Sequence, residues 1–325
     1  MDVNTRQLRY FVAVAEELNF TRAAARLHIA QQALSTQIRQ LEKAVGVTLF
    51  RRTTRTVELT SAGAAFLSEA RSVPVTLDRS VRAARRIEAN ESGVLTIGTG
   101  EGGALTLTES ILSEFRARHP GVQVDVKVYS YADPSAGLAD GSVDVAYLRL
   151  PIDGGDWLRS ETLFVEPRVV MLPASHRLAA CSVIAAAELV DEPIVGHFCN
   201  DQAWIDFWSL AEHRDGKPAN FVGRASSVLE ELQCVGAGMG CVVTVASARL
   251  VPLVGVTLVP LAGARGSELA VGWRADQETD LIRSFAAVAH SVRDANPEAV
   301  YALEHPDMSD RMVPPVPGVI HNPSR

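Results

Sequence analysis

The stretch that decides the fold of the N-terminal part is FTRAAARLHIAQQALSTQIRQLEKAVG, residues 20–46. The run of small residues at 23–25 predicts a short, closely packed helix with Thr21 as its N-cap, and residues 28–30 predict a turn. Apolar side chains then recur every three or four residues, as expected for one buried helix face. They are Leu34, Ile38, Leu41 and Val45. This second helix is predicted over residues 31–45, and Gly46 suits the left-handed residue that follows it.

The opposite face of the second helix carries polar side chains that suit DNA. They are Gln31, Gln32, Ser35, Thr36 and Arg39. Gln can pair bidentately with adenine, Arg with guanine or phosphate, and Ser or Thr with either. The alternative is a polar face that contacts only solvent.

The flanking segments favour the DNA interpretation. Residues 5–17 predict an amphipathic helix, while residues 48–50 and 56–59 predict two short strands around a basic tip. The tip contains Arg51, Arg52 and Arg55. A helix-turn-helix followed by a basic hairpin is a winged helix, in which Arg51 and Arg52 would hold phosphates and Arg55 would lie in or beside the minor groove. Thr21 is a further candidate DNA contact.

Charge is unevenly distributed along the 325 residues, whose formal net charge is −7. Residues 1–92 contain 14 Lys and Arg against 9 Asp and Glu, so they carry +5 and the remainder carries −12. Such asymmetry suggests a nucleic-acid-binding head on an acidic body. No apolar run is long enough to span a membrane and no signal peptide is recognisable, so we expect a cytoplasmic protein.

A long helix is predicted over residues 61–90, with Thr60 as its N-cap. Apolar side chains alternate at spacings of three and four, which is the pattern of a coiled-coil seam. They are Leu67, Ala70, Pro74, Leu77, Val81 and Ala84. Pro74 predicts a kink, because it removes a backbone hydrogen bond. The alternative is a helix packed only on its own chain.

From Val94 onward, strand-like and helix-like segments alternate. The predicted strands are VLTIGTG, VQVDVKVY, VDVAYLRL, RVVMLP, PIVGHF, GCVVTVA and ELAVGWR. The predicted helices cover residues 105–118, 204–213, 227–236 and 277–293. This alternation predicts an α/β fold with largely parallel sheets.

Residues 6–63 resemble the DNA-binding head of LysR-type transcriptional regulators. The resemblance lies in LRYFVAVAEELNFTRAAARLHIAQQALSTQIRQLEKAVGVTLFRRT and LTSAG. Two departures stand out: the family commonly begins its recognition helix with Ser-Gln-Pro where this chain has Ala-Gln-Gln (30–32), and it often has Arg at the position of Thr36. The missing Ser cap should cost about 1 kcal/mol of helix stability, and base preference cannot be carried over.

The resemblance continues more weakly to residue 293, through FRARHPGVQVDV, LADGSVDVAY and VLEELQCVGAGMGCVV. It implies an N-terminal all-α winged helix-turn-helix (1–63), a dimerisation helix (64–92) and an α/β effector domain (93–295) like a type II periplasmic binding protein. The effector domain would have two subdomains, 93–171 with 265–295 and 172–264, and the chain would cross near Leu172 and return near Ala264. Residues 296–325, which are Pro-rich and lack periodicity, are predicted to be a disordered or loosely attached tail.

The resemblance also places an effector cleft between the two subdomains. Its expected walls are the loop after the first strand, the end of the second strand, and the segment after a strand of the second subdomain. The candidate contacts are Thr99, Gly100, Glu101, Gly102, Ser130, Tyr131, His197, Phe198, Cys199, Asn200 and Trp204. No Lys or Arg occurs within 98–104, 129–134 or 196–204, and the nearest candidates are Arg149 and Arg224. We therefore predict a neutral, aromatic or amine-bearing effector, although many relatives bind small anions.

Three other functions compete with a ligand-responsive regulator. GTGEGG (98–103) matches the dinucleotide fingerprint GxGxxG, but the candidate ribose-binding acid, Asp125, sits in the middle of the next strand. GHFCNDQA (196–203) faintly resembles the cysteine loop of peroxide-sensing members, which would make Cys199 a redox switch. An enzyme or solute-binding module fused to a winged helix is the third, yet no GxSxG, HExxH or Walker motif occurs.

The main hypothesis is thus a regulator with no catalytic residues, cofactor or metal. The resemblance implies double-stranded DNA with two-fold symmetry, a small-molecule effector, and a homodimer or homotetramer as partners, and it allows RNA polymerase as a further one.

Overall fold

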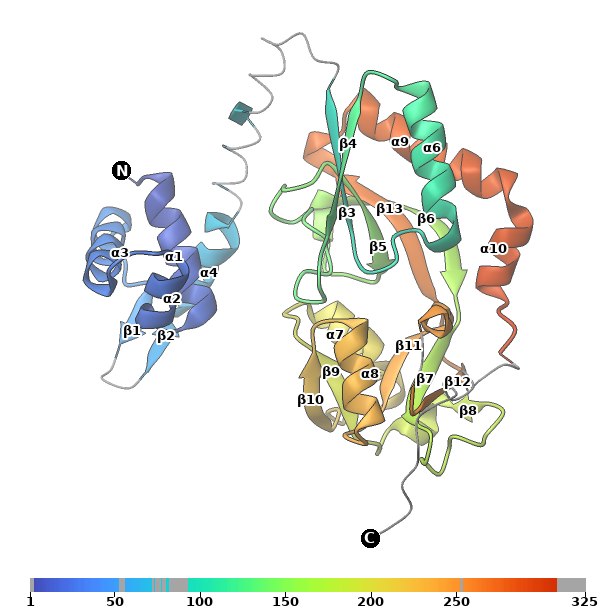
Figure 1. The fold of residues 1–325 in the computed structure, drawn as a ribbon. Helices are drawn as coiled ribbons and strands as arrows, with labels where there is room; N and C mark the ends of the chain where they lie inside the picture. The colour runs from blue at the N-terminus through green and yellow to red at the C-terminus, as the bar shows by residue number, and fades with distance from the viewer. Residues whose placement is uncertain are drawn as a thin grey trace, which may run out of the picture. The chain divides into compact units, whose positions relative to one another are not determined.

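The computed structural model describes residues 3–52, 56–71, 73, 77, 80–81, 93–251 and 254–308. It forms two compact units: a head, formed mainly by the residues up to Gly93, and a body, formed mainly by the residues from Val94 onward. Figure 1 shows the helices and strands of each unit.

The head contains a three-helix cluster and a hairpin. Its elements are α1 (Thr5–Glu17), α2 (Phe20–Arg26), α3 (Gln31–Val45), β1 (Phe50–Arg52), β2 (Val57–Leu59) and α4 (Ser61–Ala70). The strands β1 and β2 pair antiparallel, with Arg51 opposite Glu58. Fully buried Phe11, Leu34 and Ile38 hold the helices together. The predicted winged helix-turn-helix is confirmed.

Helix boundaries follow from local hydrogen bonds. Asn19, rather than the predicted Thr21, caps α2, because the Asn19 side chain accepts from the amides of Thr21 and Arg22. Thr21 lies inside the helix, so its own amide needs a cap. Ala30 before α3 makes no side-chain cap, and Gly46 ends α3 with φ of 80°. The predicted cap of α4 is correct, since Thr60 accepts from the Gly63 amide.

The predicted linker seam divides into two parts. Ala70 is buried and Leu67 is partly buried in the core of the head, so these two side chains pack within the head itself. Within the described part of the following segment, Val73, Leu77 and Val81 are helical and exposed. Pro74 and Ala84 lie outside the described residues.

The body has two lobes, each built around a sheet. The sheet of the first lobe has the order β4-β3-β5-β13-β6. Its strands are β3 (Val94–Thr99), β4 (Gln123–Val128), β5 (Val145–Leu150), β6 (Leu158–Glu166) and β13 (Ser267–Arg274). A short 3-10 turn (Leu105–Leu107) leads into α6 (Thr108–Arg118), which packs beside α9 (Asp280–Ala295) through an edge-to-face contact of Phe115 and Phe285.

The second lobe has a four-stranded sheet, β11-β7-β12-β8, and a parallel pair, β10-β9, joined to it by a bridge between Ile194 and Cys241. The strands are β7 (Arg168–Pro173), β8 (Ile184–Ala185), β9 (Ile194–His197), β10 (Phe221–Ala225), β11 (Val242–Val245) and β12 (Val256–Ala262). Its helices are α7 (Gln202–Trp208) and α8 (Val228–Gly236). Short 3-10 turns also occur in both lobes. Those of the first lobe are Gly155–Trp157 and Ala275–Gln277, and those of the second are Ala186–Leu189, Ala211–His213 and Ala246–Leu250.

Two expectations about the sheets need correction. The chain crosses between lobes at Pro167, between β6 and β7, rather than near Leu172, because all of β7 already pairs within the second sheet. It returns between β12 and β13. The sheets are mixed rather than largely parallel, since β13 runs antiparallel to β5 and β6, and β7 runs antiparallel to β11 and β12.

The predicted disordered tail also needs correction at its start. Residues Pro297–Glu304 form helix α10, which Figure 1 shows beside the first sheet. Leu303 is buried in the core of the first lobe, and the Glu304 carboxylate accepts from the Val165 amide of β6 at 3.1 Å. Pro297 is suited to the first turn of a helix because it needs no amide donor there. Residues 309–325 lie outside the described residues.

Candidate functional site

The exposed face of α3 is the candidate DNA-reading surface. Gln31, Gln32, Thr36 and Arg39 are exposed there, as predicted. Ser35 is not: it is only 8% exposed, and its hydroxyl accepts from the guanidinium groups of Arg39 and Arg52. Its burial leaves little of that hydroxyl accessible to a base edge.

The two described arginines of the hairpin have different roles. Arg51 is exposed, whereas Arg52 is half-buried, pairs with Glu42 and stacks over the Phe20 ring at 4.4 Å. Partial burial lowers the pKa of Arg52, and the Glu42 carboxylate opposes that shift. Arg52 therefore fixes the hairpin on α3 instead of offering a free charge to a phosphate. Arg55 lies outside the described residues, and Thr21 is exposed at the start of α2.

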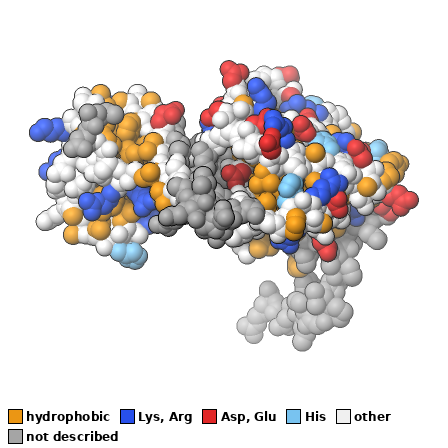
Figure 2. All heavy atoms as spheres, turned by 90° about the horizontal axis from the view of Figure 1, so that it is seen from above, with side chains coloured by type: hydrophobic (Ala, Val, Ile, Leu, Met, Phe, Trp, Pro, Cys, Tyr) orange, Lys and Arg blue, Asp and Glu red, His pale blue; other side chains and the backbone are white. Residues whose placement is uncertain are grey.

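Basic side chains stand out on the face of the head seen in Figure 2, while the visible face of the body carries both signs of charge. This agrees with the +5 of residues 1–92. A cationic head suits a polyanion such as DNA.

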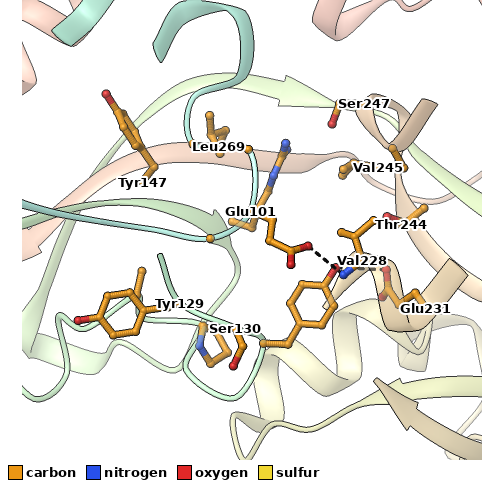
Figure 3. Close-up of a pocket in the computed structure, with 18 of the residues that line it drawn as sticks. Glu101, Tyr129, Ser130, Tyr147, Val228, Glu231, Thr244, Val245, Ser247 and Leu269 are labelled. Carbon is orange, nitrogen blue, oxygen red and sulfur yellow. Dashed lines mark hydrogen bonds between the residues drawn. The ribbon is translucent and has the colours of Figure 1, made fainter. Parts of the chain in front are cut away.

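A pocket of about 490 Å³ lies between the two lobes of the body. Apolar side chains from both lobes form much of its wall, including Leu105, Ala136, Val243, Val245 and Leu269. Pockets of this size and character commonly hold small organic ligands. Figure 3 shows many of the residues that line it.

Seven of the eleven predicted effector contacts line this pocket: Gly100, Glu101, Gly102, Ser130, Tyr131, His197 and Trp204. The other four, Thr99, Phe198, Cys199 and Asn200, do not. The Thr99 hydroxyl bonds back to the Gly100 carbonyl, and Phe198 is 52% exposed. Cys199 is buried in the core of the second lobe, and Asn200 is exposed in a loop.

The glycine loop does not complete a dinucleotide site. Gly102 and Gly103 have φ of 95° and 57°, so the loop makes a tight turn that glycine tolerates well. Asp125, however, is exposed in the middle of β4, where its backbone lies opposite Thr96 of β3. It is therefore away from the strand end where a ribose would be held.

Aromatic rings form one wall of the pocket. The Tyr131 ring lies 4.8 Å from His197 and 6.3 Å from Trp204, and Trp204 lies 5.4 Å from Trp208. The buried Glu231 carboxylate organises this wall, because it accepts from the Tyr131 hydroxyl at 3.2 Å and contacts His197 Nε2 at 2.8 Å. Two effects raise the pKa of Tyr131 well above its usual value: burial, which is the larger, and the nearby charge of Glu231.

Hydrogen bonds join the two lobes across the pocket. The Tyr131 amide of the first lobe donates to the Ser226 carbonyl of the second at 3.0 Å. The Glu101 carboxylate accepts from the Val228 amide at 2.9 Å, and the Asp201 carboxylate accepts from the Asp153 amide at 2.8 Å. These bonds can exist only while the lobes are close together.

Sequence reasoning missed Tyr147 and Glu231 and left Arg149 open. Tyr147 and Arg149 share one face of β5 because they are two residues apart, and both line the pocket. Arg149 also pairs with the buried Glu166. The alternation in VAYLRL could have shown that Tyr147 and Arg149 point the same way, but not that this face meets the cleft.

Several buried donors of the pocket wall have no hydrogen-bond partner among the described residues. They are the Tyr147 hydroxyl, Arg149 Nη1, Trp204 Nε1 and Trp208 Nε1. A buried donor without a partner costs about 1–3 kcal/mol, so a ligand oxygen that satisfied one would bind favourably.

Cys199 has the environment of a structural thiol. Burial raises its pKa to about 11, and Sγ accepts from the Asp201 amide at 3.2 Å. None of the four cysteines, all of which lie in the described part of the chain, forms a disulfide. A redox sensor needs a lowered thiol pKa, so these observations disfavour a switch at Cys199.

The body and head both match known protein families. Residues 5–64 match "Bacterial regulatory helix-turn-helix protein, lysR family", and residues 88–293 match "LysR substrate binding domain". No helix among the described residues is both long and apolar enough to cross a membrane.

Similar proteins have the same two-part organisation. The HTH-type transcriptional regulator AlsR of Bacillus subtilis (strain 168) is 33% identical over 290 residues, covering 88% of this chain and 95% of AlsR. The Hca operon transcriptional activator HcaR of Escherichia coli (strain K12) is 33% identical over 293 residues, covering 87% of this chain and 96% of HcaR.

Solved structures agree with the fold. Full-length BenM is 25% identical with a TM-score of 0.51, and the match covers 91% of this chain and 98% of BenM. CbnR, a LysR family transcriptional regulator, has a TM-score of 0.56 at 23% identity, and the match covers 90% of this chain and 99% of CbnR. At this identity the likeness supports the fold alone.

A winged helix-turn-helix head, a two-lobed α/β body with a pocket, and matches to both parts lead to one conclusion. The chain belongs to the LysR family: it is a DNA-binding transcriptional regulator with an effector-binding domain, and not an enzyme.

Proposed function

We propose that the exposed side chains of α3 read the operator and that the pocket between the lobes binds the effector. On the DNA side, Gln31, Gln32 and Thr36 would contact bases, while Arg39 and Arg51 would hold phosphates. The exposure of these side chains on one face of α3 supports this assignment. Operator DNA would lie in the cytoplasm, where we place the protein.

We further propose that two or four copies assemble on a two-fold operator. Val73, Leu77 and Val81 support this, because they are exposed at successive spacings of four on a helical segment. An apolar stripe of this kind is stabilised by burial against another helix.

The pocket indicates the chemical class of the effector. Its aromatic and aliphatic wall suits an apolar body, and the Tyr147, Arg149 and Trp204 donors, which lack partners among the described residues, suit oxygen atoms of a ligand. This set of donors is the observation that carries the proposal. The effector would be a small aromatic or apolar molecule with a hydroxyl, carbonyl or single carboxylate group.

An amine-bearing effector, which the sequence suggested, has little support from the geometry. Glu101 accepts from the Val228 amide, Glu231 is used by Tyr131 and His197, and Asp133 accepts from the Ser135 and Gly137 amides. Each acid that lines the pocket is therefore already hydrogen-bonded to the protein. An ammonium group would have to share one of these carboxylates with the protein donors that already bind it.

A matched set of probes tests this class with the full-length protein. Phenylacetate, 2-phenylethanol, 2-phenylethylamine and phenylsuccinate share a ring and differ in charge. We expect the first two to raise the thermal unfolding midpoint of the body in a saturable way. A stronger response to the amine or the dicarboxylate would contradict the proposal.

A further inference from the structure

Glu101 makes an unusual contact across the pocket. It projects from the glycine loop of the first lobe, and its carboxylate reaches the amide of Val228, the first residue of α8 in the second lobe, at 2.9 Å (Figure 3). Nothing else in the loop carries charge, because its neighbours at 100, 102 and 103 are glycines.

The start of α8 is suited to a negative group. The first amides of a helix have no partner within the helix, and the helix dipole favours an anion there. The Ser227 hydroxyl caps one of these amides, because it accepts from the backbone amide of Glu230. Val228 lines the pocket, and Glu101 takes the amide that would otherwise be offered to a ligand.

Further acids surround this position. Glu230 accepts from the amide and hydroxyl of Ser226, and the buried Glu231 is held by Tyr131 and His197. Three carboxylates therefore lie on or beside the first turn of α8. Like charges about 4 Å apart repel appreciably even at the surface of a protein. A ligand carboxylate at this position would therefore be repelled by these acids.

A second observation, which does not involve the N-terminus of α8, indicates that the pocket is suited to a ligand. The Tyr147 hydroxyl and Trp204 Nε1 belong to side chains that are 4% and 6% exposed, and neither has a partner among the described residues. The polar contacts of a ligand are thus expected at these donors and at Arg149, and not at the amides of α8.

We propose that Glu101 is a specificity-determining residue of the effector pocket. Its carboxylate fills the anion position at the N-terminus of α8, holds the two lobes together, and rejects effectors that carry a carboxylate at that end. The inference rests on the proposed function of the pocket, and it adds the reason why a second negative charge on the effector is excluded.

Rescue by a small carboxylate tests this role in the full-length protein. In Glu101→Ala the α8 amide loses its partner, so acetate should take the empty position. We expect 200 mM sodium acetate, compared with 200 mM sodium chloride, to raise the unfolding midpoint of Glu101→Ala by about 2 °C. Wild type and the control Glu109→Ala, which removes an exposed acid from α6, should not respond.

Hydrogen exchange at the Val228 amide gives a second readout. Exchange there should be about tenfold faster in Glu101→Ala than in wild type, and acetate should slow it again. Glu101→Gln keeps an oxygen acceptor of nearly the same size, so its exchange should lie between the two and should not respond to acetate. This variant separates the loss of the contact from general misfolding.

The outcomes decide between alternatives. Equal effects of acetate on wild type, Glu101→Ala and Glu109→Ala, or unchanged exchange at Val228, would overturn the role of Glu101. Because the rescue uses no effector, it can succeed even if the probe screen shows that the pocket binds none. Conversely, a ligand found in that screen would stand even if the rescue failed.

Discussion

The guanidinium of Arg52 lies 3.2 Å from the carboxylate of Glu42, and this pair ties the hairpin of the head to its third helix. The same carboxylate accepts from the amides of Leu49 and Phe50 at 2.9 and 3.1 Å. Glu42 thus fixes the chain where it leaves α3 and enters β1. One basic residue of the hairpin is structural, while its neighbour Arg51 is exposed.

Substituting the two neighbours should separate these roles. Arg52→Ala should lower the free energy of unfolding of the head by about 1–3 kcal/mol, because Glu42 and Ser35 each lose one hydrogen-bond partner. Arg51→Ala should change stability by less than about 0.5 kcal/mol but flatten the salt dependence of DNA binding by about one unit. Urea unfolding and binding titrations at several salt concentrations measure both. Equal destabilisation by the two variants would show that the assignment is wrong.

Gln32 is predicted to read a base in each half-site. Gln32→Ala should weaken operator binding by about 1–3 kcal/mol and relax the preference at one position, because a bidentate contact to adenine is lost. Selection from random DNA, followed by titration, measures both effects. Gln40→Ala is the control, since Gln40 is also exposed on α3 but lies nearer its C-terminal end. If Gln32→Ala behaved like the control, a different face of α3 would read the DNA.

Leu67 and Leu77 should respond differently to the same substitution. Leu67 packs against the core of the head, so Leu67→Asp should destabilise that unit. Leu77 is 47% exposed, so Leu77→Asp should leave the head folded while splitting the oligomer. Circular dichroism reports folding and sedimentation velocity reports assembly. An unchanged sedimentation coefficient for Leu77→Asp would exclude this stripe as a subunit interface.

Tyr147 tests the unpartnered donors of the pocket. Burial raises the pKa of its phenol, which therefore stays protonated and able to donate throughout the physiological range. Tyr147→Phe should leave the stability of the protein unchanged or slightly higher, because the lost hydroxyl has no partner among the described residues. Affinity for an oxygen-bearing probe should fall by about tenfold.

Calorimetric titration measures that affinity. The control is Tyr301→Phe, which removes a hydroxyl from a side chain that is 64% exposed on α10. Loss of affinity in the control as well, or none in Tyr147→Phe, would place the ligand elsewhere.

Cys199 should react slowly with oxidants and alkylating agents. With a pKa of about 11, roughly 0.03% of the thiol is ionised at pH 7.5, and the thiolate is the reactive form. We expect iodoacetamide to modify Cys199 only after unfolding, and hydrogen peroxide to leave DNA binding unchanged. Mass spectrometry of digested protein measures the modification. Rapid labelling of native Cys199 would revive the redox alternative.

Local sequence signals predicted the elements whose side chains contact near neighbours in the chain. The helices α1 and α3, the Thr60 cap and the glycine at 46 each depend on residues within a few positions of one another. Strands that lack a clean alternation were missed. β6 reads LRSETLFVE, with exposed polar residues at 159–161, and it is a strand because it pairs with β13 about 100 residues later.

The same limit explains why the sequence did not show the contacts of two candidate DNA-binding residues. Ser35 and Arg52 have the residue types of a DNA contact, but Ser35 of α3 is held by Arg52 of the hairpin. Arg52 in turn contacts Glu42 of α3 and Phe20 of α2. Helix α10 lacks strong periodicity, yet the surface of β6 and α9 makes its burial favourable. A residue's type shows which contacts it can make, and only the packing shows which of them it does make.

The sequence by itself determined the family, the winged head and the loops that border the pocket, because these depend on short-range patterns that can be recognised without knowledge of distant residues. Only the tertiary structure decided which face of β5 meets the pocket, that Glu231 organises Tyr131 and His197, and that Glu101 bonds to Val228 across 127 positions of chain. The physical reason is that the chain crosses between the lobes at Pro167 and returns after β12. Those two crossings bring residues from separate sheets to within hydrogen-bonding distance.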